Sequence, residues 1–292
     1  MGHGIALTMA RAGHQICVQD TFPDSLASLH ERIKVSMQGM GVDAAESDQT
    51  LLRIRSTENL ADALADADLV FEAAPEKLEL KQALFEQIEK HVSKSCILAS
   101  NTSVMPITNI MQKVKHKQRA LGTHWWNPPH LIPLVEVVST QKTDSDCVDH
   151  MVQLLNDVGK TAIRVNKDIP GFIGNRLQHA LWREAISLVE NGVCDAKSVD
   201  AVVKASFGKR LAVLGPLENA DLVGTDLTLD IHSRVLFDLE SRQGPSPYLE
   251  QLVSEGKLGM KSGTGFRDWS QDEANELRAR VIQHLNKLET IL

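Results

Sequence analysis

The sequence predicts an α/β domain built on a doubly wound, largely parallel sheet, followed by an all-helical domain. Three observations predict this fold class. In the first half of the chain, short apolar runs alternate with stretches of helical periodicity. After Pro170 the apolar residues recur at helical spacing, and beyond Gly192 no segment has a convincing strand pattern. Apolar strands that alternate with helices are typical of a parallel sheet covered on both faces.

Local signals predict the first elements. A helix is expected over 4–12, ending at Gly13, because glycine tolerates the left-handed geometry of a helix end. Residues 14–20 are expected to form a strand that ends in an acid, Asp20. A helix is then expected over 25–40. Its apolar face is formed by Leu26, Leu29, Ile33 and Met37.

Five later runs are short and nearly all apolar, and each predicts a strand. They are 69–71, 96–99, 120–122, 134–138 and 162–165. Between the first two runs, apolar residues from Leu84 to Val92 recur at helical spacing and predict a helix. Strands and helices in this alternation are the units of an α/β sheet.

The second half of the chain is expected to be helical. A long helix is predicted over 172–189, and Asn191-Gly192 ends it. Residues 271–292 are charged on one face and predict a solvated amphipathic helix. The pattern changes near 166–170, which predicts a domain boundary there. The two predicted domains are 1–168 and 169–292.

Composition argues against several classes of partner. The net charge is −7 and the Lys and Arg residues are scattered, whereas a nucleic-acid-binding protein needs a basic patch. No apolar run approaches the ~20 residues of a membrane-spanning helix, and no signal peptide is recognisable. The 4 cysteines lie far apart with no Cys/His cluster, so we expect no metal site and a reducing, cytoplasmic location.

The N-terminal residues M-G-H-G, placed before a helix, a strand and Asp20, look like the tail of a glycine-rich dinucleotide-binding loop. In such a loop, glycines such as Gly2 let the backbone and a helix N-terminus approach a pyrophosphate. An acid after the second strand accepts hydrogen bonds from ribose hydroxyls, which favours NAD over NADP. The same residues are also compatible with a flexible N-terminus and a solvated loop acid.

Four short motifs follow one another along the chain. S-N-T-S occupies 100–103, H-W-W-N-P begins at His124, L-V-E-V contains Glu136, and P-G-F-I-G-N-R begins at Pro170. Glu136 lies 12 residues after His124, which in turn lies 21 residues after Ser103. In order and separation, these motifs resemble those of the NAD-dependent 3-hydroxyacyl-CoA dehydrogenases. The resemblance covers essentially the whole chain, through K-S-G-T-G-F at 261–266.

The resemblance implies a catalytic site. His124 matches the family's general base, and Glu136 matches the carboxylate that orients it. Oxidising a secondary alcohol requires removal of the hydroxyl proton as hydride leaves. A histidine titrates near the working pH, and a carboxylate behind it fixes the ring tautomer. Ser103 and Asn175 match the residues that hydrogen-bond the reacting oxygen. Without the motifs, a single histidine is more often structural than catalytic.

The resemblance also implies NAD as the cofactor, bound in a Rossmann-like first domain. Glu76, Lys81, Asn127 and Lys261 match positions that contact the cofactor in this family. Relatives dimerise through their helical domain, so a homodimer is expected. The family's first strand and two loop glycines would precede Met1. We therefore expect roughly a dozen native N-terminal residues to be absent from this chain. The alternative is a naturally shortened protein that binds NAD poorly.

Two departures from the family pattern concern the substrate. The region around 28–57 lacks the lysine cluster that acyl-CoA enzymes usually carry after their second strand. Residues 207–216 include Arg210 and resemble relatives that act on small, CoA-free substrates, such as gulonate, carnitine and pyridine-carboxylate dehydrogenases. Arg210 could clamp a free carboxylate, or it could be a surface arginine.

The sequence therefore predicts an NAD-dependent dehydrogenase that oxidises the secondary alcohol of a 3-hydroxyacyl-CoA or related 3-hydroxy acid to the 3-oxo product. One alternative is a dehydrogenase of a small CoA-free hydroxy acid or pyridine-carboxylate alcohol. Another is a catalytically silent structural relative, as lambda-crystallin shows that the family permits. Retention of Ser103, His124, Glu136 and Asn175 together favours an enzyme, because a structural protein does not need all four.

Overall fold

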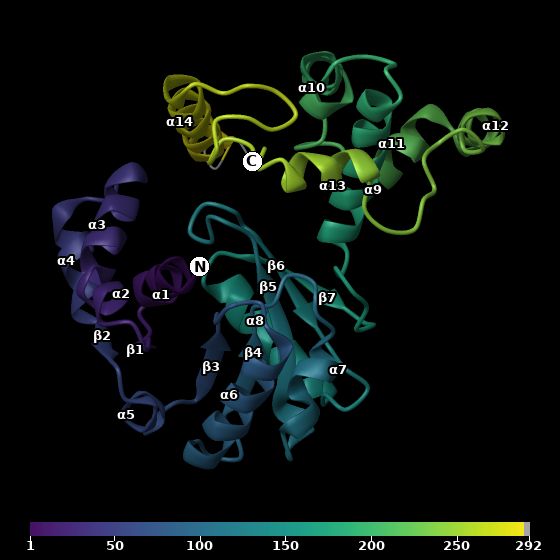
Figure 1. Ribbon diagram of the computed structural model, residues 1–292. Helices are drawn as coiled ribbons and strands as arrows, with labels where there is room; N and C mark the ends of the chain where they lie inside the picture. Colours follow the sequence, from purple (N-terminus) through teal and green to yellow (C-terminus); the bar gives the residue numbers. More distant parts are fainter. Residues whose placement is uncertain (289–292) are drawn as a thin grey trace. The chain divides into compact units, whose positions relative to one another are not determined.

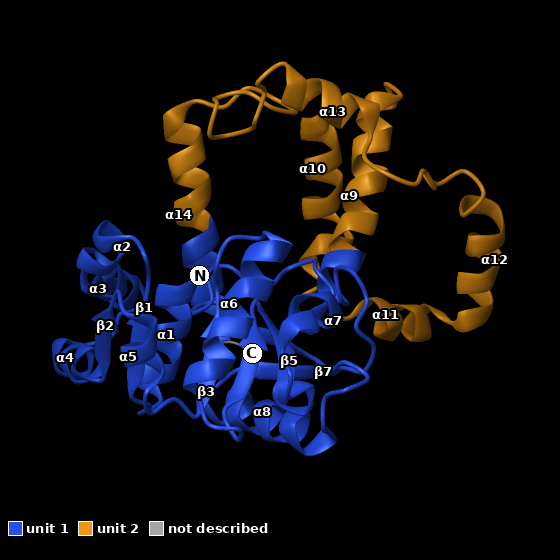
Figure 2. Cartoon of the chain, turned by 60° about the horizontal axis from the view of Figure 1, so that its bottom comes forward, with its two compact units in different colours: residues 1–176, 281–292 blue, residues 177–280 orange. Residues whose placement is uncertain are grey.

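A computed structural model describes residues 1–288 of the chain. The chain forms two compact units, coloured separately in Figure 2. Unit 1 comprises residues 1–176 together with the chain from Val281 onward, and unit 2 comprises 177–280. The division falls between Arg176 and Leu177, inside a long helix. The domain bounds expected from the sequence, 1–168 and 169–292, remain a prediction.

Unit 1 contains a five-stranded sheet (Figure 1). Its strands lie in sequence order: β3 (Leu69–Glu72), β4 (Ile97–Ser100), β5 (Ala120–Trp125), β6 (Leu134–Val138) and β7 (Thr161–Val165). The pairs β3–β4, β4–β5 and β6–β7 are parallel, but β5–β6 is antiparallel. The sheet is therefore largely parallel, as expected, with one antiparallel pair that the sequence did not predict. The connection over 126–133 is too short for a helical crossover, so β6 returns antiparallel to β5.

A separate two-stranded sheet pairs β1 (Ile16–Gln19) with β2 (Ile54–Thr57) in parallel. Among the described residues, β1 pairs only with β2, and β3 pairs only with β4. The strand β2 was not expected, because its sequence I-R-S-T carries only one apolar residue. The helix expected over 25–40 is two helices, α2 (Pro23–Ala27) and α3 (Leu29–Gly39), separated at Ser28.

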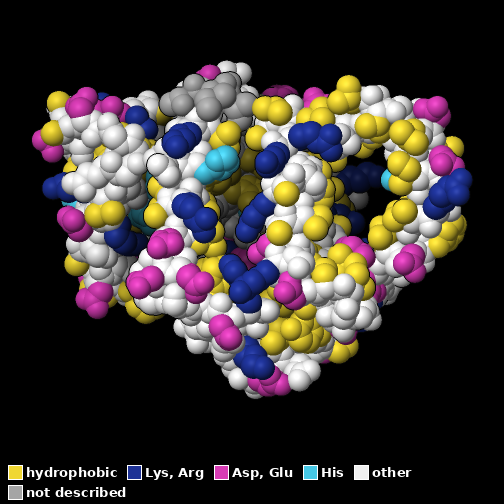
Figure 3. Space-filling view, turned by 90° about the horizontal axis from the view of Figure 1, so that it is seen from above, with side chains coloured by type: hydrophobic (Ala, Val, Ile, Leu, Met, Phe, Trp, Pro, Cys, Tyr) yellow, Lys and Arg dark blue, Asp and Glu magenta, His cyan; other side chains and the backbone are white. Residues whose placement is uncertain are grey.

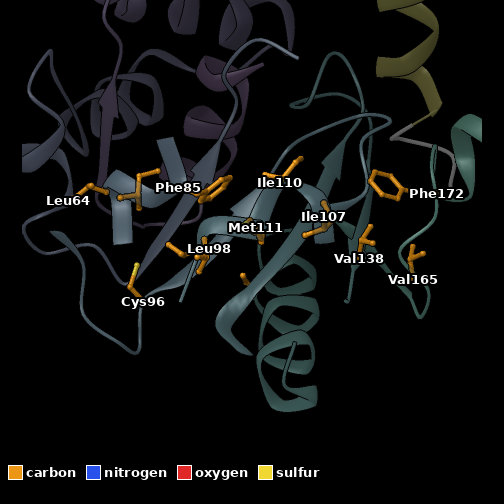
Figure 4. Packing of buried hydrophobic residues seen from close by; sticks show 13 residues of the cluster. Leu64, Phe85, Cys96, Leu98, Ile107, Ile110, Met111, Val138, Val165 and Phe172 are labelled. Atoms are coloured by element: carbon orange, nitrogen blue, oxygen red, sulfur yellow. The ribbon is translucent and has the colours of Figure 1, made fainter. Parts of the chain in front are cut away.

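Both faces of the five-stranded sheet are covered. One buried cluster packs α6 (Leu78–His91) and α7 (Ile107–Ile110) against the sheet, and Figure 4 shows its side chains. The other cluster packs α1 (Gly2–Arg11) and α8 (Ser145–Asp157) against the opposite face. Leu98 belongs to the first cluster and Ala99 to the second, as expected for successive residues of a strand. This two-sided burial confirms the doubly wound arrangement.

The other helices of the first 176 residues are short. They are α4 (Ala44–Leu52), α5 (Leu60–Leu64) and the 3₁₀ turns η1 (Met111–Lys113) and η2 (Lys117–Arg119). Asp43 caps α4 and Asn59 caps α5, each through a side-chain oxygen that accepts backbone N–H bonds. Neither helix was expected, because neither presents a regular apolar stripe.

Unit 2 is helical, as the sequence predicts. Its elements are α9 (Gly174–Glu190, begun in unit 1), α10 (Ala196–Ala205), η3 (Phe207–Lys209), α11 (Pro216–Val223), α12 (Thr225–Val235), α13 (Pro247–Ser254) and most of α14 (Gln271–Leu288). Its described residues pair only as isolated bridges, between Gly259 and Thr264 and between Thr264 and Asp268. The last four residues of the helix expected over 271–292 lie outside the described residues. No described helix is long and apolar enough to cross a membrane.

Candidate active site

The side chains of His124 and Glu136 form a buried pair. The antiparallel register of β5 and β6 places the two residues directly opposite each other. The imidazole Nδ1 lies 2.7 Å from Glu136 Oε2, and both side chains are at most 5% exposed. Cross-strand neighbours are the closest side chains in a sheet, so the register alone brings the pair into contact. The twelve-residue spacing from His124 to Glu136 spans the β5–β6 hairpin that produces this register.

The second oxygen of Glu136 binds the start of α9. Its Oε1 accepts hydrogen bonds from Ile173 N at 2.8 Å and Gly174 N at 3.1 Å. Burial raises the pKa of Glu136. The bonds from His124, Gly174 and Ile173 together with the His124 charge outweigh burial, so the pKa lies below its ordinary value. The carboxylate therefore stays ionised while it holds the imidazole.

The turn before α9 is shaped by the motif P-G-F-I-G-N-R. Gly171 has φ 75° and Phe172 has φ 50°, and Phe172 is the one non-glycine residue with positive φ among those described. The Phe172 side chain is fully buried, and its ring centroid lies 5.6 Å from that of His124. This left-handed turn directs two consecutive N–H groups at Glu136. Backbone strain of this kind persists where the surroundings enforce it, often at functional sites.

A pocket of about 370 Å³ opens beside the pair, within unit 1. It is lined by Met1, Asn101, Ser103, His124, Trp125, Trp126, Asn127 and Asn175. Four of these residues were singled out from the sequence as site residues. His124 Nε2 has no hydrogen-bond partner among residues 1–288, so the ring has one nitrogen held by Glu136 and one available to a ligand.

Ser103 and Asn175 meet at the pocket. Ser103 lies in the turn after β4, and its carbonyl accepts a hydrogen bond from Asn175 Nδ2 at 2.7 Å. Its backbone N–H donates to Glu76 Oε1 at 2.9 Å. The backbone of Ser103 is therefore held on both sides, while its hydroxyl binds no group in the described part of the chain. That hydroxyl is available to a polar atom in the pocket.

The residues expected to bind NAD are placed as follows. Asp20 follows β1 directly, and its Oδ1 accepts from Phe22 N. Gly2 begins α1, whose first turn carries no acidic residue. A Cβ atom added at Gly2 would meet no other atom within 4 Å. Asn127 lines the pocket. The open backbone at a helix N-terminus fits the pyrophosphate of a dinucleotide. Lys261 and Arg210 belong to unit 2 and are exposed there.

Glu76 and Lys81 differ in exposure. The Glu76 side chain is 36% exposed, whereas Lys81 is fully buried. Burial raises the pKa of Glu76, but hydrogen bonds from Thr102 and Ser103, and then the Lys81 charge, bring the pKa below its ordinary value.

No metal-binding cluster of His, Cys, Asp or Glu occurs among the residues that the structure describes.

The sequence interpretation did not single out three residues at or behind the pocket. Asn101 Oδ1 accepts from Trp125 N at 2.9 Å and so joins β4 to the end of β5. Trp126 lines the pocket and packs on His124, with ring centroids 5.3 Å apart. Its ring leaves no room for a side chain at Gly174, where a Cβ would lie 2.4 Å from Cζ2. Glu72 lies behind the pocket as the acid that ends an apolar strand, a signal visible in L-V-F-E.

Comparison with known proteins gives consistent matches. The model of the 3-hydroxyacyl-CoA dehydrogenase NAD-binding domain matches residues 1–169, and that of the C-terminal domain matches 171–269. A 5-formyl-3-hydroxy-2-methylpyridine 4-carboxylate 5-dehydrogenase from Mesorhizobium japonicum is 33% identical over 295 residues, covering 100% of this chain and 95% of the relative.

Two solved structures are also similar. One is of a 5-formyl-3-hydroxy-2-methylpyridine 4-carboxylic acid 5-dehydrogenase, described as an NAD⁺-dependent dismutase. It matches with a TM-score of 0.92 and 32% identity, covering 100% of this chain and 94% of its own. The other is of (S)-3-hydroxybutyryl-CoA dehydrogenase from Ralstonia eutropha, with a TM-score of 0.77, 28% identity, and coverage of 93% and 96%.

The geometry of Glu136 predicts the outcome of Glu136→Gln. The glutamine oxygen can still accept from Ile173 N and Gly174 N, which turns the amide NH₂ toward His124 Nδ1. A neutral imidazole then accepts at Nδ1 and carries its proton on Nε2, the opposite tautomer from the wild type. We expect ¹⁵N shifts of the His124 side chain, assigned by comparison with His124→Gln, to exchange between the two ring nitrogens. Unchanged shifts would contradict this account.

Proposed function

This chain belongs to the 3-hydroxyacyl-CoA dehydrogenase family, and we propose that His124 and Glu136 carry its dehydrogenase reaction on a small, CoA-free hydroxy acid. The chain is an NAD-dependent oxidoreductase acting on CH–OH groups, as its two matched domains indicate. The observation that carries the site assignment is the buried His124–Glu136 pair, with Nε2 of the ring open to the pocket.

Each side chain has a defined task in this proposal. His124 Nε2 accepts the hydroxyl proton of the alcohol, and Glu136 at Nδ1 stabilises the imidazolium that results. The Ser103 hydroxyl and the Asn175 amide hydrogen-bond the reacting oxygen as it becomes a carbonyl. Bound NAD would supply the acceptor for the hydride that leaves the carbinol carbon. The alcohol thus loses one proton and one hydride and becomes a ketone.

The cofactor contacts are assigned in the same way. Gly2 admits the pyrophosphate to the start of α1, and Asp20 accepts hydrogen bonds from the adenine ribose. Asn127 contacts the cofactor from the pocket wall, and Lys261 is a further proposed contact, carried over from the family motif. Support for the first two comes from the open space at Gly2 and from the position of Asp20 at the end of β1.

The first test of this function is His124→Gln. Loss of a positioned base is expected to lower kcat roughly 10²- to 10⁴-fold. Formation of NADH or NADPH would be followed at 340 nm with 3-hydroxyacyl-CoAs, 3-hydroxy acids and pyridine-carboxylate alcohols. Each substrate would be assayed once with NAD and once with NADP. His150→Gln, an exposed histidine of α8, is the control and should behave as the wild type.

Two outcomes contradict the proposal. If His124→Gln keeps more than a tenth of the wild-type kcat with chemistry rate-limiting, His124 is not the base. If NAD and NADP support comparable kcat/KM, Asp20 does not select the cofactor.

The substrate class rests on three features. The chain matches the pyridine-carboxylate enzyme over its full length with a TM-score of 0.92, against 0.77 for the 3-hydroxybutyryl-CoA enzyme. The lysine cluster of acyl-CoA enzymes is absent from the sequence over 28–57. Arg210 is an exposed cation directly after η3, in the segment that resembles the CoA-free relatives. A 3-hydroxyacyl-CoA is the second candidate, because both matched domain models are those of 3-hydroxyacyl-CoA dehydrogenase.

Arg210→Ala separates the two substrate classes. If Arg210 clamps a carboxylate, KM for a free hydroxy acid should rise roughly thirtyfold, the equivalent of about 2 kcal/mol for a charge-assisted hydrogen bond. Lys209→Ala, which removes the neighbouring exposed cation, should leave KM unchanged. An enzyme that prefers acyl-CoA, with KM indifferent to Arg210→Ala, would restore the acyl-CoA candidate.

We propose further that unit 2 dimerises. Its helices and loops expose large apolar side chains, and Figure 3 shows hydrophobic side chains spread over much of one face of the molecule. The most exposed are Val213, Leu217, Leu222, Leu229 and Phe237, at 70% exposure or more. Apolar patches of this extent are typical of interaction surfaces, and self-association is the commonest solution.

Light scattering tests the dimer. We expect twice the 32.2 kDa of one chain at micromolar concentration. Phe237→Ser with Leu229→Ser should shift the mass toward that of one chain, while Glu79→Gln on α6 should not. A wild-type protein that scatters as a single chain contradicts the proposal.

A further inference from the structure

Lys81, in the first turn of α6, is a lysine without solvent contact. Its side chain is 1% exposed, and its ammonium lies among three oxygen acceptors. These are Glu72 Oε1 at 2.7 Å, Ala74 O at 3.1 Å and Glu76 Oε2 at 3.2 Å. An ammonium has three N–H donors, so this ion is fully coordinated by its own chain.

Glu72 is the buried counter-ion of Lys81. It is the last residue of β3, in register with Ser100 at the end of β4. Its Oε1 accepts from Lys81 Nζ and from Ala74 N at 2.6 Å, and its Oε2 accepts from Ser100 Oγ at 2.6 Å. Its backbone carbonyl accepts from Asn101 N at 2.8 Å. One residue therefore fixes α6, the loop after β3 and the end of β4.

Glu76 connects this buried pair to the pocket. One of its oxygens faces Lys81, and the other accepts bonds from Thr102 Oγ1 and Ser103 N. Thr102 is fully buried, and its hydroxyl also accepts from Met105 N. The Glu76 carboxylate therefore binds the buried Lys81 on one side and the turn that carries Ser103 on the other.

We propose that Glu72 and Lys81 are positioning residues for the reaction: the buried pair holds Glu76, and through it the turn that carries Ser103, in place beside the pocket. This inference rests on the proposed function of Ser103. It gives Glu72 a role that no motif in the sequence indicates.

The chemistry of the pair favours positioning over simple stabilisation. A buried ion pair seldom adds net stability over apolar residues of similar volume, but removal of one partner leaves an unpaired buried charge. The pair can therefore be removed as a unit with much less loss of stability than either half. A double variant can then separate its effect on folding from its effect on the Ser103 turn.

The experiment compares Glu72→Gln, Lys81→Met and the double variant in the full chain. Measured quantities are Tm, kcat/KM for the best alcohol of the panel, and the NADH Kd by fluorescence. Each single variant should lose roughly 10 °C in Tm and at least tenfold in kcat/KM, and should raise the NADH Kd because Glu76 is no longer held. The double variant should regain at least half of the lost Tm, yet its kcat/KM should stay at least tenfold low and its NADH Kd should stay raised. Glu79→Gln and Lys90→Met, exposed residues of α6, are matched controls.

Recovery of kcat/KM and NADH Kd together with Tm in the double variant would overturn the proposal and leave a purely structural pair. If the charge variants do not fold, Ser100→Ala removes one partner of Glu72 without removing a charge. It should lower kcat/KM at least threefold, and a wild-type value would equally overturn the proposal. If the wild type oxidises no alcohol, the proposed function fails, and the NADH Kd of the double variant still decides the positioning role.

Discussion

The structure of the site depends on one antiparallel step in an otherwise parallel sheet. Because the chain turns back between β5 and β6, His124 lies across from Glu136 and forms the 2.7 Å contact. Glu136 then binds the first N–H groups of α9, so the strand pair, the turn at Phe172 and the start of that helix share one carboxylate. A parallel β6 would present different residues to His124, and the pair would not form.

The sequence predicted the elements that carry their own periodic signal. The apolar strands, the helix at α6 and the helical second half are present, since strong periodicity and burial act together there. It did not predict β2, whose residues are held by pairing with β1, nor the break at Ser28. Nor did it predict the direction of β6. Tertiary pairing decides these features, and a single sequence does not display it.

For the candidate site, the sequence predicted residues that line the pocket but not the contacts behind them. His124, Ser103, Asn127 and Asn175 line one pocket, and the motifs had marked all four. The contacts of the supporting layer were not predictable, because they join residues of distant segments. Glu72 and Ser100 are 28 positions apart and Asn101 and Trp125 are 24 apart. Lys81 illustrates the limit: the family resemblance implied that it contacts the cofactor, but only the structure shows its burial and its three oxygen acceptors.

Gly174 has a consequence for how the pocket can diversify. Its missing side chain is the space that the Trp126 ring fills, and its N–H is one of the bonds to Glu136. Any larger residue here would force the Trp126 ring to move, while the backbone donor would remain. The pocket wall and the bond to Glu136 therefore depend on different atoms of one residue. Substitution of Gly174 would reshape the wall at Trp126, which lines the pocket, and would keep the backbone N–H that binds Glu136.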